Sequence, residues 1–510
     1  ADADHGRDTR ATGNAEPQCA LPEWSLPLPS PPMPMPAEHA AAILAWLGTK
    51  RLAEVERGLA DPAQLAPLLG HADAIADAAD SDDETVRGSG LGALFSGLIE
   101  PLNDGFTPAG RALYARLFAR IAWRVATRDA RLAERLRGFG LAGEAALLAR
   151  YQAARHATTL APERAQRVLV LSRVTIGADI LLTSTVLVRL RQRYPNAELV
   201  LLGDGKLAGL FAGLPGVRVR PLSYGRRGAL RERLASWLTV VDAVAAEAPD
   251  LVVGPDSRLD QLGVLPVTAD PARTLLWENT QPEGQPVRSL GELLDDWLVA
   301  RLGTVWGRRA LPALGLDAAA AATRATFTAA LGPAGIAAVK LDHGGNPAKA
   351  LPRAAEVAIL QALRGRGWRI LLDRGFGADE LANSDALLSA LGWTALDVDD
   401  SGKGLGLPVQ GLLPGQLMQT PVVRFHGSIA GWAGGVAACT LALSYDSVGH
   451  HLAAALGVPV VVAFTGYADP GFPAAWQPRG PAAVTVVAIP TADKDQPAQW
   501  ERVLAALPNP

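Results

Sequence analysis

The spacing of hydrophobic residues changes near residue 163 and divides the chain into regions of different structure. Between residues 38 and 162, apolar residues recur at intervals of three and four, with Gly and Pro between the runs. This period predicts helices, because it gathers the apolar residues on one helix face. We therefore expect an all-helical accessory domain over 38–162, preceded by a flexible arm at 1–37 that is first polar and then Pro-rich.

From residue 163 onward, short apolar runs alternate with amphipathic segments. RVLVL (167–171) opens a first series, and IAAVK (336–340) opens a second one after an Ala-rich linker. Strands that alternate with helices at this spacing form right-handed βαβ units around a parallel sheet. The expected fold class is α/β, with two doubly wound Rossmann-like domains at 163–312 and 313–510 that face each other across a cleft. The last helix could cross back to the first of these domains.

Composition narrows the class of protein. Hydrophobic residues make up 49% of the 510, charged residues 19%, and the net charge is −3. This net charge provides no excess of positive charge that would attract nucleic acid or an acidic membrane surface, so we expect no nucleic-acid partner. No apolar stretch is long enough to predict a membrane-spanning segment. Cys19 and Cys439 stand in unrelated contexts and indicate no disulfide framework, so a cytoplasmic location is expected.

One strand-to-helix connection carries the clearest chemical signal. In LALSYDSVGHHLAAALGVPVVVAFTG (441–466), a strand delivers Asp446 and Ser447 to the start of a small-residue helix. A helix N-terminus aims free N–H groups and a positive dipole end at one point, which suits a phosphate. The segment therefore indicates a diphosphate site. The alternative is an ordinary connection in which Ser447 only caps the helix.

Three short motifs, in chain order, resemble glycosyltransferase family 9, the heptosyltransferases. RVTIGADILLT (173–183) is similar to the family's R-x-x-x-x-G-D-[VI]-L-x-T, and KALP (349–352) to its K-x-W-P. DSVGHHLAAALGVP (446–459) is similar to D-[ST]-G-x-x-H-L-A-A-A-x-G-x-P. The resemblance covers about residues 167–505. The helical region and the arm have no counterpart in it.

The resemblance implies a GT-B fold and an inverting, metal-independent glycosyltransferase. The donor would be a nucleotide-diphosphate sugar, with ADP-heptose as the best guess, and the acceptor a glycan, a lipid-linked group or a protein. Neither a cofactor nor a metal is expected, and the scattered histidines form no metal-binding motif. Self-association through the helical domain is a further expectation.

Inverting transfer needs a base on the acceptor side, and the resemblance assigns that role to Asp179. The leaving diphosphate would be neutralised by Lys349 and by the backbone amides of Ser447, Val448 and Gly449. These assignments have structural alternatives. Asp179 could be a helix cap, and Lys349 could be a solvated surface residue.

The remaining site predictions concern the donor loop and the acceptor side. Asp446 and His451 would brace the loop or touch the donor, and Glu380 matches an acidic position that the family uses on the ribose. His451 could equally be a core histidine. Gly344 and Gly345, which follow the strand IAAVK, would let the backbone approach the donor closely. Arg173 and Thr183, from the first motif, would lie on the acceptor side.

The chain departs from the family pattern at three places. Ala178 stands where the family has a glycine before its catalytic Asp, and Gly177 lies one place earlier. Leu351 stands where K-x-W-P has its tryptophan. Val448 stands where the family has a glycine after Asp-Ser, and Gly449 lies one place later. Because Val rarely adopts positive φ, we expect a rebuilt phosphate turn. The alternative functions are a transferase of the same fold that uses another nucleotide-sugar and a protein or small-molecule acceptor, or a non-catalytic GT-B-like protein that binds nucleotide-sugars or serves as a scaffold.

Overall fold

Helices form the first part of the chain, as the sequence period predicts. The computed structural model describes residues 35–156, 160–222, 224–333, 335–342, 346–467 and 469–510. Residues 1–34, which make up most of the predicted arm, lie outside this description, as do Gly344 and Gly345. The helices are α1 (Pro36–Leu47), α2 (Leu52–Ala60), α3 (Pro62–Ala79), α4 (Glu84–Leu94), α5 (Glu100–Asp104), α6 (Pro108–Ala126), α7 (Ala130–Gly138) and α8 (Glu144–Arg155), with a π-helical turn (Phe95–Ile99) between α4 and α5.

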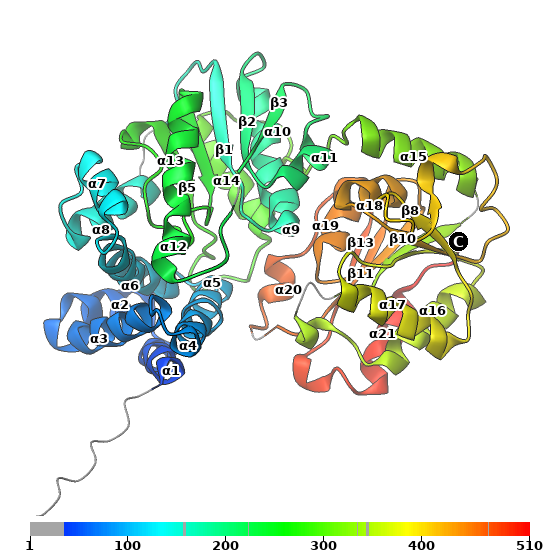
Figure 1. Cartoon of the computed structure of the whole chain (residues 1–510), viewed down its shortest axis with the longest axis horizontal. Helices are drawn as coiled ribbons and strands as arrows, with labels where there is room; N and C mark the ends of the chain where they lie inside the picture. Colours follow the sequence, from blue (N-terminus) through cyan, green and yellow to red (C-terminus); the bar gives the residue numbers. More distant parts are fainter. Residues whose placement is uncertain (1–34, 157–159, 223, 334, 343–345, 468) are drawn as a thin grey trace, which may run out of the picture. The chain divides into compact units, whose positions relative to one another are not determined.

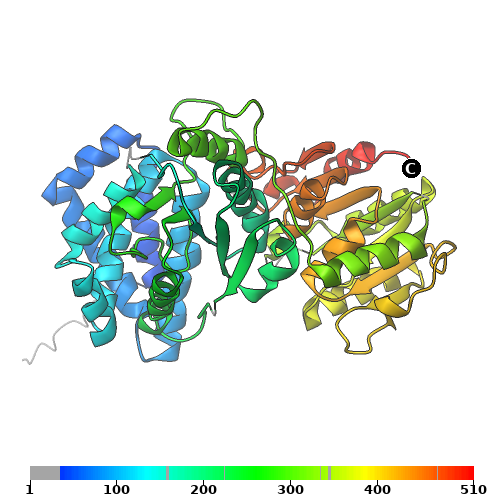
Figure 2. The same ribbon diagram turned by 90° about the horizontal axis from the view of Figure 1, so that it is seen from above.

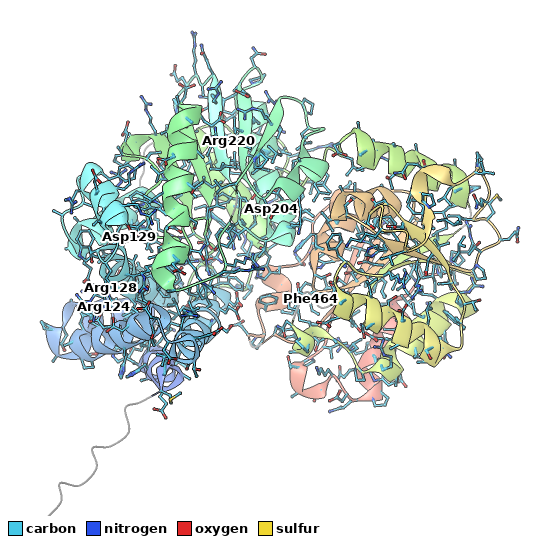
Figure 3. All side chains as sticks on the ribbon, viewed as in Figure 1. Arg124, Arg128, Asp129, Asp204, Arg220 and Phe464 are labelled. Carbon is cyan, nitrogen blue, oxygen red and sulfur yellow. The ribbon has the colours of Figure 1, made fainter. Side chains whose placement is uncertain are left out.

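Helix α6 is the centre of the helical region. It begins with Pro108 after the cap Thr107, whose hydroxyl accepts the N–H of Gly110 at 3.0 Å. Arg124, on its outer face, and Arg128, just after its end, lie side by side (Figure 3), and both pair with Asp77 of α3. The inner face of α6 belongs to an apolar core that continues into the next domain through the buried Trp237 and Leu262. The helical region therefore packs directly on the first α/β domain.

The first α/β domain is built on a five-stranded parallel sheet (Figure 1). Its strand order is β3-β2-β1-β4-β5, so the order reverses at β1 and β4. One face packs on α10 and α14 and the other on α13. The strands are β1 (Arg167–Leu171), β2 (Glu198–Gly203), β3 (Val217–Pro221), β4 (Leu251–Pro255) and β5 (Thr274–Trp277), and the helices are α9 (Ile176–Ala178), α10 (Ser184–Arg193), α11 (Ala208–Phe211), α12 (Leu230–Leu234), α13 (Ser236–Glu247) and α14 (Leu290–Leu302).

The second α/β domain holds an eight-stranded parallel sheet in the order β13-β12-β11-β6-β7-β10-β8-β9. Figure 2 shows this domain in colours from yellow-green to red. Helices α16, α17 and α21 cover one face, and α15, α18 and α19 cover the other. The strands are β6 (Ile336–Lys340), β7 (Arg369–Asp373), β8 (Leu396–Asp399), β9 (Leu407–Pro408), β10 (Val422–His426), β11 (Leu441–Tyr445), β12 (Val460–Phe464) and β13 (Val484–Ala488), and the helices are α15 (Ala318–Leu331), α16 (Arg353–Gly365), α17 (Ala378–Leu391), α18 (Ile429–Val436), α19 (Val448–Ala455), α20 (Phe472–Ala475) and α21 (Pro497–Ala506).

The two parallel sheets with interleaved helices confirm the predicted fold class. The Ala-rich linker, however, is helix α15, which Asp317 caps by accepting the N–H of Ala320 and which buries Phe327. The sequence did not predict strands β8, β9 and β10. After the loop that follows β1, the chain forms a π-helical turn (Asp179–Thr183) that leads into α10. In the part of the chain that is described, no helix has the length and apolar character needed to cross a bilayer.

Candidate active site

A cleft of about 1560 Å³ opens at the carboxyl ends of the strands of both sheets. In doubly wound sheets, ligands bind where the strand order reverses. Here β1 and β4 mark that point in the first sheet, and β6 and β11 mark it in the second. The lining comes from loops after β1, β2, β3, β6, β11 and β12, together with residues of the helical region. All three parts of the chain therefore contribute to one site.

Lys349 and Asp446 form the charged centre of the wall that the second domain supplies. The Lys349 ammonium lies 2.5 Å from Asp446 Oδ2 and 3.3 Å from the Asp446 carbonyl oxygen. It also lies 5.9 Å from the centre of the Phe472 ring. An ammonium has three N–H donors, so this arrangement orients Lys349 and leaves a donor for a ligand.

Helix α19 starts directly beside this pair. Ser447 caps it, and its hydroxyl accepts the Gly449 N–H at 3.4 Å. Val448 is the first helical residue and lines the cleft. The predicted rebuilding of the turn takes a simple form, since neither Val448 nor Gly449 has positive φ. Gly449 is needed for space, because a Cβ there would lie 2.7 Å from Ser444 Oγ and 3.0 Å from Lys340 Cδ.

Two buried histidines follow the cap. Burial lowers the pKa of His450 to about 4, although Asp446 opposes this shift, and burial lowers the pKa of His451 well below its usual value. Both are therefore neutral at pH 7. His451 lines the cleft, and its ring meets the first domain at Gly177. A Cβ on Gly177 would lie 3.3 Å from His451 Cδ2, so the displaced glycine lets α9 approach α19 closely.

The structure places Asp179 beneath the loop after β1. Its carboxylate is 1% exposed and accepts three hydrogen bonds, from the Ser172 hydroxyl at 2.7 Å, the Arg173 N–H at 2.7 Å and the Thr183 hydroxyl at 2.6 Å. Burial raises the pKa of Asp179 even though these bonds oppose the shift. Ser172 and Ala178 line the cleft, whereas Asp179 does not. Its observed contacts hold the loop and the π-helical turn.

Arg173 also points away from the cleft lining, into a buried network. Its guanidinium lies 3.1 Å from Asp256 Oδ2 and stands over the ring of Trp476, 5.8 Å from the ring centre. Arg111 of α6 reaches the same Asp256 oxygen at 3.3 Å. Burial alone would raise the pKa of Asp256, but the surrounding guanidinium groups hold it well below its usual range. This network joins the helical region to the loop after β1.

Two other predicted site residues lie away from the cleft lining. Thr183 is fully buried against Asp179. Glu380 caps α17 by accepting the N–H groups of Phe376 and Gly377 at 2.5 and 2.8 Å, and it lies outside the cleft lining. The cleft thus brings together one subset of the predicted donor-side residues: Lys349, Asp446, Ser447, Val448 and His451.

Several cleft residues were not predicted from the sequence. Lys206, Arg226 and Arg227 bring positive charge from the loops after β2 and β3, and Asp204 (Figure 3) lies beside Lys206. Asp104 enters the cleft from the helical region. These residues occur in loops with no motif around them, so only tertiary packing reveals their grouping. Among the described residues, no group of three or more His, Cys, Asp or Glu could hold a metal ion.

Comparison with known proteins gives a likeness at the level of fold. No protein-family model and no curated protein matches the sequence. Solved glycosyltransferases do resemble the structure. A glycosyl transferase family 9 protein from Veillonella parvula is 16% identical (TM-score 0.46), with 65% of this chain and 88% of that chain covered. The ADP-heptose LPS heptosyltransferase II of E. coli is 16% identical (TM-score 0.45), with 66% and 96% covered. The E. coli heptosyltransferase WaaC with ADP is 18% identical (TM-score 0.46), with 66% and 97% covered.

Proposed function

We propose that the protein is an inverting glycosyltransferase that moves heptose or a related sugar from a nucleotide-diphosphate donor to an acceptor hydroxyl. The observation that carries the proposal is the grouping of Lys349 with the N-terminus of α19 at the reversal point of the second sheet. A cation and free backbone N–H groups at one point provide what a departing diphosphate requires. ADP-heptose is the first donor to test, because the motifs resemble those of the heptosyltransferases.

The donor would bind with its diphosphate at Lys349 and the first turn of α19. No metal is needed in this scheme, since the ammonium and the helix dipole supply the positive charge. The neutral His451 would contact the sugar or the phosphates by hydrogen bonding, because its pKa keeps it uncharged. Its Nδ1 is buried and has no hydrogen-bond partner among the residues that the structure describes, so it can serve a ligand.

The acceptor would enter against the wall formed by the first domain. Arg226 and Arg227 are exposed there, on the loop after β3, with Lys206 nearby on the loop after β2. This positive wall favours an acceptor that carries phosphate or carboxylate groups, whether a glycan, a lipid-linked group or a protein. Opposite signs of charge on an acceptor and on this wall would also speed their association.

Thermal unfolding with a panel of ADP, UDP, GDP, TDP and CDP tests the donor site. A ligand that binds only the folded state stabilises it, by about 2.7 kcal/mol at a hundredfold excess over Kd. We expect one nucleotide to raise the midpoint clearly and the others to act weakly. If none of the five changes the midpoint, the proposed donor site does not exist.

A further inference from the structure

Asp179, the base that the sequence motif predicts, is connected to the cleft through Ser172. The Asp179 carboxylate accepts hydrogen bonds from the Ser172 hydroxyl, the Arg173 N–H and the Thr183 hydroxyl. Asp179, Arg173 and Thr183 all lie outside the cleft lining, whereas Ser172 belongs to it. Among the residues that the structure describes, Ser172 is thus the one hydrogen-bond donor to Asp179 that also lines the cleft.

The hydrogen bonds around Ser172 fix the direction in which its hydroxyl points. The Val174 N–H donates to Ser172 Oγ at 2.9 Å, so the hydroxyl oxygen is the acceptor in that bond. The hydrogen of the hydroxyl goes to Asp179 Oδ2, which lies 2.7 Å away. A hydroxyl oxygen has two lone pairs, so one of them remains for a donor from the cleft. The hydroxyl of an acceptor can therefore donate to Ser172 while both existing bonds are kept.

The surrounding backbone holds the Ser172 side chain in place. Val174 has a φ of +77°, a conformation that β-branched residues rarely adopt and that persists only where the surroundings enforce it. The bond from the Val174 N–H to Ser172 contributes to this, as does the bond from the Ser257 hydroxyl to the Ser172 carbonyl at 2.6 Å. Gly203 packs on the serine, because a Cβ there would lie 2.5 Å from Ser172 Cβ. A group that transfers a proton needs such a fixed position.

The loop that carries Ser172 also touches the proposed donor site. A Cβ on Gly177 would lie 3.6 Å from Val448 Cα, and Val448 opens α19. The proposed function places the diphosphate of the donor at this first turn, and the anomeric carbon is bonded to that diphosphate through one oxygen. The cleft lining continues from Gly177 back to Ser172. Ser172 therefore lies on the part of the wall that borders the reacting carbon.

We infer that Ser172 relays the proton of the attacking hydroxyl to Asp179. The inference rests on the proposed glycosyl transfer, with Asp179 as its base. The acceptor oxygen forms a bond to the anomeric carbon and gives its proton to Ser172 Oγ, while the Ser172 proton passes to Asp179 Oδ2. The bond from the anomeric carbon to the phosphate oxygen breaks, and its electron pair leaves with the diphosphate. Asp179 ends protonated and Ser172 ends unchanged, so a carboxylate outside the cleft lining acts as the base without leaving its place.

The test compares two variants that each remove one hydroxyl donor from Asp179. Ser172→Ala interrupts the path to the cleft, whereas the nearly isosteric Thr183→Val removes a donor that lies outside the lining. ADP release from ADP-heptose is measured as a function of pH, first with water and then with glucose 6-phosphate as the acceptor. We expect Ser172→Ala to lower the plateau rate by about 100-fold or more, the usual contribution of assisted proton transfer. Thr183→Val should lower it by no more than about 10-fold, the effect of one hydrogen bond to a charged group.

The pH dependence separates an action on Asp179 from a loss of packing. The Asp179 carboxylate must be ionised to accept a proton, so the rate should rise with pH through its pKa. Both hydroxyl groups lower this pKa by donating to the carboxylate. Each variant should therefore move the rise to higher pH, which a change in packing alone would not do. The control Thr328→Val removes an exposed hydroxyl on α15, outside the cleft, and should match the wild type.

Two further measurements exclude a merely structural role of Ser172. Ser172→Cys keeps a group that can both donate and accept a proton in nearly the same volume, so it should recover part of the rate that Ser172→Ala loses. The shift of the unfolding midpoint by ADP should persist in both Ser172 variants, because the second domain supplies the proposed donor site. Loss of this shift would overturn the inference, since it would assign Ser172 to folding or to donor binding.

Three kinetic results would also overturn the relay. The first is an equal loss of rate in Ser172→Ala and Thr183→Val, which would make Ser172 only one of the donors that hold Asp179. The second is a Ser172→Ala variant close to the wild-type rate while Asp179→Asn is inactive, which would mean that the acceptor reaches the carboxylate directly. The third is a Ser172→Cys variant no faster than Ser172→Ala. Failure of the proposed function looks different, because the wild-type protein would then neither bind ADP nor release it from ADP-heptose, and the inference would fall with it.

Discussion

The Lys349 ammonium lies 2.5 Å from the Asp446 carboxylate, and the two residues come from loops that follow different strands of the second sheet. The carboxylate holds the Lys349 ammonium at the N-terminus of α19, where the ammonium and the helix N-terminus would together stabilise the negative charge of a diphosphate. Because the pair is partly open to the cleft, with the Lys349 side chain 24% exposed, a ligand can reach it.

Replacing Lys349 should therefore weaken nucleotide binding. For Lys349→Ala we expect the affinity for ADP to fall by about 10- to 100-fold, which is what a charge-assisted hydrogen bond to a phosphate contributes. Isothermal titration calorimetry measures this directly. Lys50→Ala, which removes a lysine of the helical region outside the cleft, is the matched control and should bind like the wild type. Equal affinity in Lys349→Ala and the wild type would exclude the proposed phosphate role.

Asp104 should reduce stability at neutral pH. Its pKa is about 6 in the folded protein against an ordinary value of 3.8, so the folded state binds the proton more tightly. The free energy of unfolding should then fall as pH rises from about 4 to 6. Asp104→Asn removes this effect and should raise the free energy of unfolding at pH 8 by about 1–2 kcal/mol, with no gain at pH 4. Urea titrations at the two pH values measure the difference, and a variant less stable than the wild type at pH 8 would contradict it.

Gly449 should tolerate no side chain. A Cβ at this position meets Ser444 and Lys340, so Gly449→Ala should lower the free energy of unfolding by about 1–3 kcal/mol and shift the start of α19. Gly70→Ala is the control, because Gly70 lies within α3 and nothing stands within 4 Å of an added Cβ. There alanine should stabilise by about 0.5–1 kcal/mol through helix propensity. Chemical denaturation of both variants gives the comparison, and equal effects would show that the packing argument fails.

The Asp256 network should hold the helical region in place. Asp256→Asn leaves the buried guanidinium groups of Arg111 and Arg173 without their shared carboxylate, so we expect a loss of about 3–5 kcal/mol. The exposed pair of Arg135 and Asp242 offers the matched case, and Asp242→Asn should cost about 0–1 kcal/mol. Hydrogen exchange should show the loss first in α6 and in the loop after β4. A change in Asp256→Asn no larger than in Asp242→Asn would refute the assigned role.

The α/β architecture was predictable because most strands are short buried runs rich in Val and Leu. The runs at β1, β6 and β12 stand out from the helical segments between them. Strands β8, β9 and β10 were not predicted. Strands β8 and β10 carry charged residues in place of a continuous apolar run, and the charge of Arg424 on β10 is satisfied by Asp397 on the neighbouring β8, a pairing that only the folded sheet supplies. Helix α15 was taken for a linker because its many alanines give little contrast between its two faces.

The site was predictable where it is local in sequence. Asp446, Ser447, Val448 and His451 follow one strand, and the motif places them together. Lys349 was found through its own short motif. Asp104 could not be found in this way, because it reaches the cleft only through the packing of the helical region. Asp179 matches its motif, yet its burial depends on hydrogen bonds that the sequence does not reveal.

The most direct test of glycosyl transfer is a phosphorus NMR time course of the wild-type protein with ADP-heptose, first with water and then with an added phosphorylated glycan as the acceptor of the sugar. The central claim predicts that the diphosphate signals of the sugar nucleotide disappear and that those of free ADP appear, at a rate proportional to protein concentration. Lys349→Ala should slow this conversion strongly. If ADP-heptose binds and stays intact, the cleft belongs to a non-catalytic nucleotide-sugar-binding protein, and the proposed activity is contradicted.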